Sequence, residues 1–317
     1  MPQLVFIHGI GGPRQEDQEL ISWRTALLTG ARAAGHSRWA ADVLAGNGPA
    51  MRFADYSRLF RDEQAQGGSA GLDADEAEIL ASLLRETIEI QLAEERPDPT
   101  TRRSLQKARA ALEPSDEGQG VFNAVRHVTA AVTALLSVPP LRRGGQWLAT
   151  KVMVAELAQV ARYLARAERD HDGRTLDERI RARVGAVLTG EPSVVVAHSL
   201  GSVVALELLA EHTGSVPLLV TIGSPLAVRT VVLPRLRPHP PRTPDCVGQW
   251  LNFWDRDDVI AARPILENVV SANEAGVLPR SRRVDSDGLW VHTATKYLSQ
   301  SDVAGRIVEF LDGGGTA

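Results

Sequence analysis

The segment around Ser199 constrains the fold of this 317-residue chain more than any other feature. An apolar, β-branched run over 193–197 leads into this serine, and a helical pattern follows it at 200–212. Because strand and helix meet at the serine, the turn must be tight, and small residues are needed two positions before and after it. Ala197 and Gly201 occupy those positions. Such a turn lifts the serine hydroxyl above the sheet, at the amino end of the following helix.

Strand and helix patterns alternate on both sides of this turn. Short apolar runs typical of buried strands occur at 4–7, 51–56, 193–197, 216–222 and 249–254. Helical patterns lie between and after them, at 17–34, 176–188, 200–212 and 303–311. This alternation predicts an α/β fold, in which helices cover both faces of a mostly parallel sheet.

Between about 60 and 180 no strand pattern appears, and long helical patterns replace the alternation. Apolar residues at helical spacing predict three helices there: about 73–92, 121–138 and 146–169. Pro97 and Pro99 end the first of them.

The two strand-containing parts of the chain must form one sheet, because neither buries its apolar residues alone. We therefore expect a single catalytic α/β domain made of 1–58 and 174–317. The helices at 59–173 then form an insertion or cap, partly packed on the sheet.

The composition is that of a globular chain, with 44% apolar and 23% charged residues. Its 35 basic and 39 acidic residues give a net charge of −4, which argues against a nucleic-acid binder. The longest uncharged apolar run, 128–141, is shorter than the roughly 20 residues that span a bilayer, so we expect no transmembrane segment. The amino terminus carries no signal-peptide pattern, which predicts a cytoplasmic protein.

The single cysteine, Cys246, excludes an intrachain disulfide and any multi-cysteine zinc or iron–sulfur site. Its neighbours, Pro-Asp-Cys-Val-Gly, carry no signature of a nucleophile, so a structural thiol is favoured.

A second glycine-rich turn follows the first predicted strand, as His8-Gly-Ile-Gly-Gly12. These glycines let the backbone approach a ligand closely. A phosphate-binding loop is disfavoured, because the segment lacks both the Lys-Ser/Thr pair of a P-loop and the Gly-x-Gly-x-x-Gly spacing.

These segments resemble the α/β-hydrolase superfamily, and more narrowly its lipase- and esterase-like members. Three motifs carry the resemblance: Ala197-His-Ser-Leu-Gly-Ser202, Val5-Phe-Ile-His-Gly-Ile-Gly11 and Thr221-Ile-Gly-Ser-Pro-Leu226. Ala197 replaces the usual first glycine of Gly-x-Ser-x-Gly. The similarity covers about 1–56 and 150–312 and leaves out the insertion. It implies the α/β-hydrolase fold and a triad in the chain order serine, acid, histidine.

A nucleophilic serine needs a base to take its proton, and Ser199 is followed by three histidines. His212 belongs to the helix after the serine and points elsewhere. His239 lies in a proline-rich loop. His292 precedes the segment leading to the last helix, where the resembling enzymes place their catalytic histidine, so it is favoured over His239.

The acid should follow the strand at 249–254, where Asp255, Asp257 and Asp258 compete. Lipase-like members often read Asn, five residues, Asp, an apolar pair and Ala. Counting from Asn252 reaches Asp258, which is favoured, and the other two aspartates stay open as alternatives.

The resemblance also implies an oxyanion hole made by the backbone N–H groups of Ile10 and Leu200. His8 would shape this loop through a backbone hydrogen bond. Further supporting positions in the two turns are Gly9, Gly11 and Gly201.

The implied activity is that of a serine hydrolase that cleaves a small-molecule or lipid-like carboxylic ester through an acyl-enzyme, without a metal or organic cofactor. An amidase, peptidase or thioesterase would use the same triad. A non-catalytic interaction protein on the same fold is the other class. For the apolar helix at 121–138, ordinary packing is favoured over a lid that contacts lipid-like acyl chains. Peripheral membrane contact through the helical insertion stays open.

Overall fold

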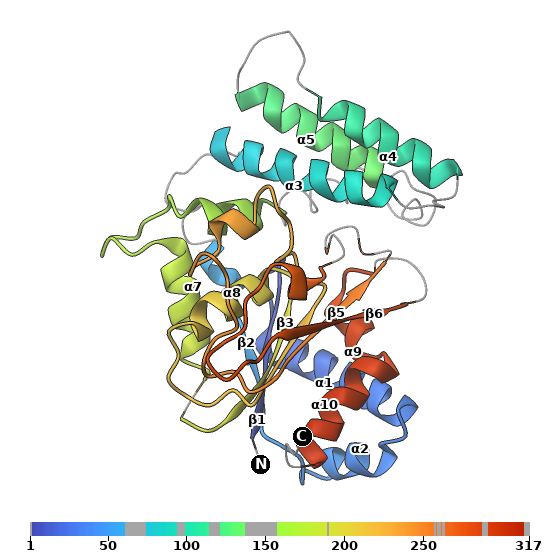
Figure 1. The fold of residues 1–317 in the computed structure, drawn as a ribbon, viewed down its shortest axis with the longest axis vertical. Helices are drawn as coiled ribbons and strands as arrows, with labels where there is room; N and C mark the ends of the chain where they lie inside the picture. Colours follow the sequence, from blue (N-terminus) through green and yellow to red (C-terminus); the bar gives the residue numbers. More distant parts are fainter. Residues whose placement is uncertain are drawn as a thin grey trace.

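A computed structural model describes residues 2–60, 74–93, 99–113, 121–136, 157–188, 190–256, 258, 261, 264–286 and 291–313. In these residues six strands form one all-parallel sheet in the order β2-β1-β3-β4-β5-β6. The strands are β1 Gln3–Ile7, β2 Met51–Ala54, β3 Ser193–His198, β4 Leu218–Ile222, β5 Trp250–Asp255 and β6 Pro279–Val284. A parallel sheet flanked by helices confirms the predicted α/β class (Figure 1).

Helices cover both faces of the sheet, and alternate strand residues point to each. Leu4 and Phe6 of β1 belong to one apolar cluster, whereas Val5 and Ile7 belong to the other. The first cluster includes α1 Glu16–Ala33, α2 Ser37–Leu44, α9 Ala294–Leu298 and α10 Ser301–Asp312. The second includes a helix containing 157–165, α7 Leu176–Gly185 and α8 Leu200–Leu209. Burial on both faces explains why β1, β3 and β4 read as continuous apolar runs.

Three helices pack on one another beyond the carboxyl end of the sheet: α3 Ala74–Leu92, α4 Pro99–Ala111 and α5 Val121–Leu136 (Figure 1). Glu86 of α3 accepts the backbone N–H groups of Arg229 and Thr230 at 2.7 Å, in the loop after β4. Gln91, on the same helix, donates to the Arg256 carbonyl after β5 at 3.0 Å. Polar side chains of α3 are thus bonded to two loops at the carboxyl end of the sheet, where Ser199 lies.

Val128, Ala131, Val132 and Ala134 of α5 are buried in the cluster shared with α3 and α4. No helix of the described residues is long and apolar enough to cross a membrane.

Four of the described α-helices and strands were not predicted: α2, α4, α9 and β6. The sequence of α4 is strongly polar, and its Pro99 occupies the first helical position, where a missing N–H costs nothing. The β6 strand reads Pro-Arg-Ser-Arg-Arg-Val and lies at the edge of the described sheet, where an apolar run is not required. Of the helix predicted at 146–169, residues 146–156 lie outside the described part.

Candidate active site

Ser199 lies in a strained turn between β3 and α8. Its φ of 52° and ψ of −127° fall in a region that side chains other than glycine avoid. Hydrogen bonds hold the turn on both sides: the Ser199 N–H donates to the Ile222 carbonyl at 3.1 Å. The Ser202 hydroxyl donates to the Ser199 carbonyl at 2.6 Å. Strain maintained in this way places the Ser199 side chain at the carboxyl end of the sheet.

Two glycines let the turn pack against the loop after β1. A Cβ atom on Gly201 would lie 2.3 Å from the His8 carbonyl oxygen. A Cβ atom on Gly9 would lie 2.5 Å from the Ser199 Cβ. Real Cβ atoms do not approach other atoms so closely, so both positions need glycine for steric reasons.

The structure brings Ser199, His292 and Asp258 into one hydrogen-bonded chain. His292 Nε2 lies 2.8 Å from the Ser199 Oγ. On its other side, His292 Nδ1 lies 2.8 Å and 2.9 Å from the two carboxylate oxygens of Asp258. In this arrangement the carboxylate orients the imidazole, and the imidazole can accept the serine proton.

Asp258 is fully buried, yet its pKa is lowered. Burial alone would raise the pKa, but the interaction with His292 and hydrogen bonds from His292, Tyr297 and the Ala261 N–H outweigh it. Asp258 is therefore a carboxylate at neutral pH.

Tyr297 of α9 bonds directly to this carboxylate. Its hydroxyl donates to Asp258 Oδ2 at 2.7 Å and accepts the Asp255 N–H at 3.0 Å. Burial, and then the charge of Asp258, raise the pKa of Tyr297 well above its usual value, so the phenol keeps its proton. The sequence gives no local signal for this contact, because Tyr297 lies 39 positions from Asp258.

The alternative acid and base residues lie in other surroundings. Asp255 ends β5, and its carboxylate accepts the N–H of Ser286. Asp257 lies outside the described residues. His239 is exposed, and His212 lies beyond the carboxyl end of α8.

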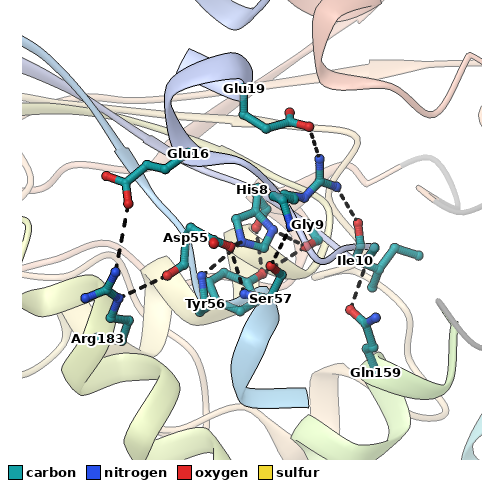
Figure 2. Close-up of polar contacts among 12 residues, drawn as sticks. His8, Gly9, Ile10, Glu16, Glu19, Asp55, Tyr56, Ser57, Gln159 and Arg183 are labelled. Atoms are coloured by element: carbon teal, nitrogen blue, oxygen red, sulfur yellow. Dashed lines mark hydrogen bonds and ion pairs between the residues drawn. The ribbon is translucent and has the colours of Figure 1, made fainter. Parts of the chain in front are cut away.

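His8 is buried under the loop that follows β1 (Figure 2). Its Nδ1 lies 2.6 Å from the Gly9 carbonyl, and its Nε2 accepts the Tyr56 N–H at 3.1 Å. The Tyr56 hydroxyl donates to the His8 carbonyl at 2.6 Å, and the two rings stack with centroids 4.0 Å apart. Burial lowers the pKa of His8, and contact with Asp55 opposes that shift.

Asp55 and Tyr56 come directly after β2 and were not predicted as site residues. Polar side chains at the carboxyl end of a parallel strand are a usable signal for such a role.

The peptide between Ile10 and Gly11 is held at both ends (Figure 2). The Gly11 N–H donates to the side-chain oxygen of Gln159 at 3.0 Å, and the Arg14 guanidinium donates to the Ile10 carbonyl at 2.8 Å. Gly11 and Gly12 have φ of 109° and 126°, where other residues are strained. Without the two side chains, this peptide would rotate easily.

Two backbone donors near the serine stay open. No acceptor for the N–H of Ile10 or of Leu200 is present among the described residues. Leu200 begins α8, and the first N–H groups of a helix have no partner within it. Both groups are thus available to a bound oxyanion.

His198 lies beside His292, with ring centroids 4.8 Å apart. Burial, and then the neighbouring His292, lower the pKa of His198 well below its usual value, so this ring is neutral. His292 therefore has a neutral imidazole, and no positive charge, beside it.

Cys246 lies in the loop before β5, at the other end of the sheet. Its thiol donates to the Leu209 carbonyl at 3.4 Å, and burial raises its pKa to about 11. A thiol with this pKa is a poor nucleophile at neutral pH.

Comparisons of the chain with protein-family models, with curated proteins and with solved structures gave no match.

Proposed function

We propose that this protein is a serine hydrolase of the α/β-hydrolase type, which cleaves a carboxylic ester through an acyl-enzyme on Ser199. The observation that carries the proposal is the hydrogen-bonded chain from Ser199 through His292 to Asp258. Its members lie 93 and 34 positions apart in the sequence. They converge at a strained strand–turn–helix junction, in the order serine, acid, histidine that is typical of this fold.

The reaction follows from the positions of these groups. The Ser199 Oγ attacks the ester carbonyl carbon while His292 Nε2 takes the hydroxyl proton. Asp258 stabilises the imidazolium that forms, and the N–H groups of Ile10 and Leu200 bind the negative oxygen of the tetrahedral intermediate. When the intermediate collapses, the carbon–oxygen bond of the leaving alcohol breaks and His292 returns the proton to that alcohol. Water, deprotonated by His292, then attacks the acyl-enzyme. The bond between the acyl carbon and Ser199 Oγ breaks, His292 returns the proton to Oγ, and the acid leaves.

An ester fits the surroundings of the serine. Leu200 and Leu226 are buried in the apolar cluster on this side of the sheet, and the partly buried Ile10 packs against it. An uncharged acyl group is compatible with these neighbours, whereas a free charge would have to be desolvated. A small or lipid-like ester is therefore the proposed substrate class.

The test is hydrolysis of 4-nitrophenyl esters of increasing chain length, with an anilide and a thioester of the preferred acyl group alongside. We expect the wild type to cleave esters and Ser199→Ala to have no activity. The control variant Ser202→Ala, on the same turn, should keep part of the activity. Faster cleavage of the anilide or thioester would move the assignment to an amidase or a thioesterase. Ester turnover equal in the wild type and Ser199→Ala would refute the proposal.

A further inference from the structure

A hollow opens at the end of the sheet opposite to Ser199. Its volume is about 580 Å³, within the range of small-molecule sites. It is lined by the starts of β5 and β6, by the carboxyl half of α10, and by Pro217 just before β4. Because the strands are parallel and Ser199 follows the carboxyl end of β3, the length of the sheet separates this hollow from the proposed active site.

The charge of this hollow comes from β6 and α10. Arg280 and Arg282 are two positions apart on the strand, so both point to the face that α10 covers. Val284 continues the same row and is buried in the apolar cluster of that face. Both arginines are exposed instead, and within the described residues neither side chain has a hydrogen bond or ion pair.

Arg306 of α10 adds a third guanidinium to the lining. It pairs with Glu309 at 2.9 Å, and Glu309 also lines the hollow. Three guanidinium groups therefore face one carboxylate, which leaves an excess of two positive charges. Guanidinium groups bind phosphate oxygens in pairs of parallel hydrogen bonds, so this excess favours a phosphate over a single carboxylate.

The rest of the lining includes two apolar side chains. Leu251 of β5 is buried, and Phe310 of α10 is half-buried against the apolar cluster. An aromatic or aliphatic group can pack on such a surface while its phosphate contacts the arginines.

We propose that this hollow binds a phosphate-bearing small molecule. Its phosphate lies between Arg280 and Arg282, and its apolar or aromatic portion lies against Leu251 and Phe310. The site uses none of the hydrogen-bonded residues Ser199, His292 and Asp258, and it is independent of the proposed hydrolase activity.

The test is calorimetric titration of the whole protein with inorganic phosphate, pyrophosphate and a nucleoside diphosphate. We expect saturable binding that Arg280→Gln with Arg282→Gln weakens at least about tenfold, since charged hydrogen bonds are lost. Arg283→Gln is the matched control, because Arg283 is on the same strand but pairs with Asp285 at 2.6 Å. Tighter binding of the nucleotide than of pyrophosphate, reduced by Phe310→Leu, would assign the apolar wall to the ligand.

Circular dichroism before and after substitution checks that each variant is folded. Two results would overturn the proposal: none of the three probes binds saturably, or the Arg280/Arg282 and Arg283 variants bind equally. Arg280 and Arg282 would then serve only to prevent the edge strand β6 from pairing with other chains.

Discussion

At the carboxyl end of the sheet, Ser199, His292 and Asp258 are largely buried and bonded to one another, whereas at the amino end Arg280 and Arg282 face solvent with no partner among the described residues. Asp258 is fully buried and accepts hydrogen bonds from three groups. Internal bonds of this kind fix the positions of reacting groups before a substrate arrives, which favours covalent chemistry. Exposed charged groups that have no partner in the protein can form hydrogen bonds with a ligand instead. Substitutions at the carboxyl end of the sheet should therefore change the rate of ester hydrolysis. Substitutions at the amino end should change only the binding of anions.

The largest effect is expected from Asp258→Asn. An amide cannot stabilise the imidazolium and favours the wrong tautomer of His292, so kcat for ester hydrolysis should fall by about 10⁴-fold. Steady-state kinetics measure this, and circular dichroism should show little change in folding. A larger loss in Asp257→Asn would assign the acid to Asp257 instead.

Gly201→Ala should reduce both stability and activity. The added methyl group would lie 2.3 Å from the His8 carbonyl oxygen, and such overpacking costs about 1–3 kcal/mol of unfolding free energy. Thermal melting and ester turnover report the two effects. Gly190→Ala is the control, because a Cβ atom there meets nothing within 4 Å. Equal melting temperatures for the two variants would show that the turn does not need glycine at 201.

Gln159→Leu should act on the rate without touching the serine. It frees the Gly11 N–H, so the peptide between Ile10 and Gly11 can rotate. The adjacent Gly9–Ile10 peptide, which carries the Ile10 N–H, is then held less firmly. We expect kcat to fall about tenfold with KM nearly unchanged. Gln159→Glu keeps an acceptor at this position and should recover much of the rate. If KM rises instead and kcat stays constant, Gln159 contacts the substrate and does not position the loop.

The smallest effect is expected from Tyr297→Phe, and it depends on pH. The hydrogen bond from Tyr297 helps to keep the pKa of Asp258 below 3.8, so it stabilises the folded protein above that pH. The stabilisation is lost as the pH falls through the lowered pKa of the folded state, because Asp258 is then protonated. Denaturant unfolding of the wild type and the variant should therefore differ near neutral pH and converge in acid. If the difference in unfolding free energy stays constant with pH, Tyr297 stabilises the protein through packing and not through its hydrogen bond to Asp258.

Much of the sheet could be predicted from the sequence because β1, β3 and β4 are buried on both faces and read as apolar runs. The β6 strand could not, since an edge strand with Arg280, Arg282 and Arg283 carries no such run. The apolar pattern also fails for α4, because this helix has few large apolar residues. It consists largely of good helix formers (Ala, Arg, Gln and Lys) and packs on α3 and α5.

The candidate site divides in the same way. Ser199 follows from a local motif and His292 from a chain order. For the acid, the sequence favours Asp258 and leaves Asp255 and Asp257 open. Gln159 could not be found, since its contact with Gly11 joins positions 148 apart and no motif marks it. Contacts of this kind arise only from the way the insertion packs on the sheet.

The most direct test of the account is covalent labelling with a fluorophosphonate probe, followed by mass spectrometry of the modified peptide. Such a probe reacts with a serine only where a base activates it. The account predicts one modified residue, Ser199, with labelling lost in Ser199→Ala and strongly slowed in His292→Ala. Labelling of the wild type no faster than that of Ser199→Ala would contradict it.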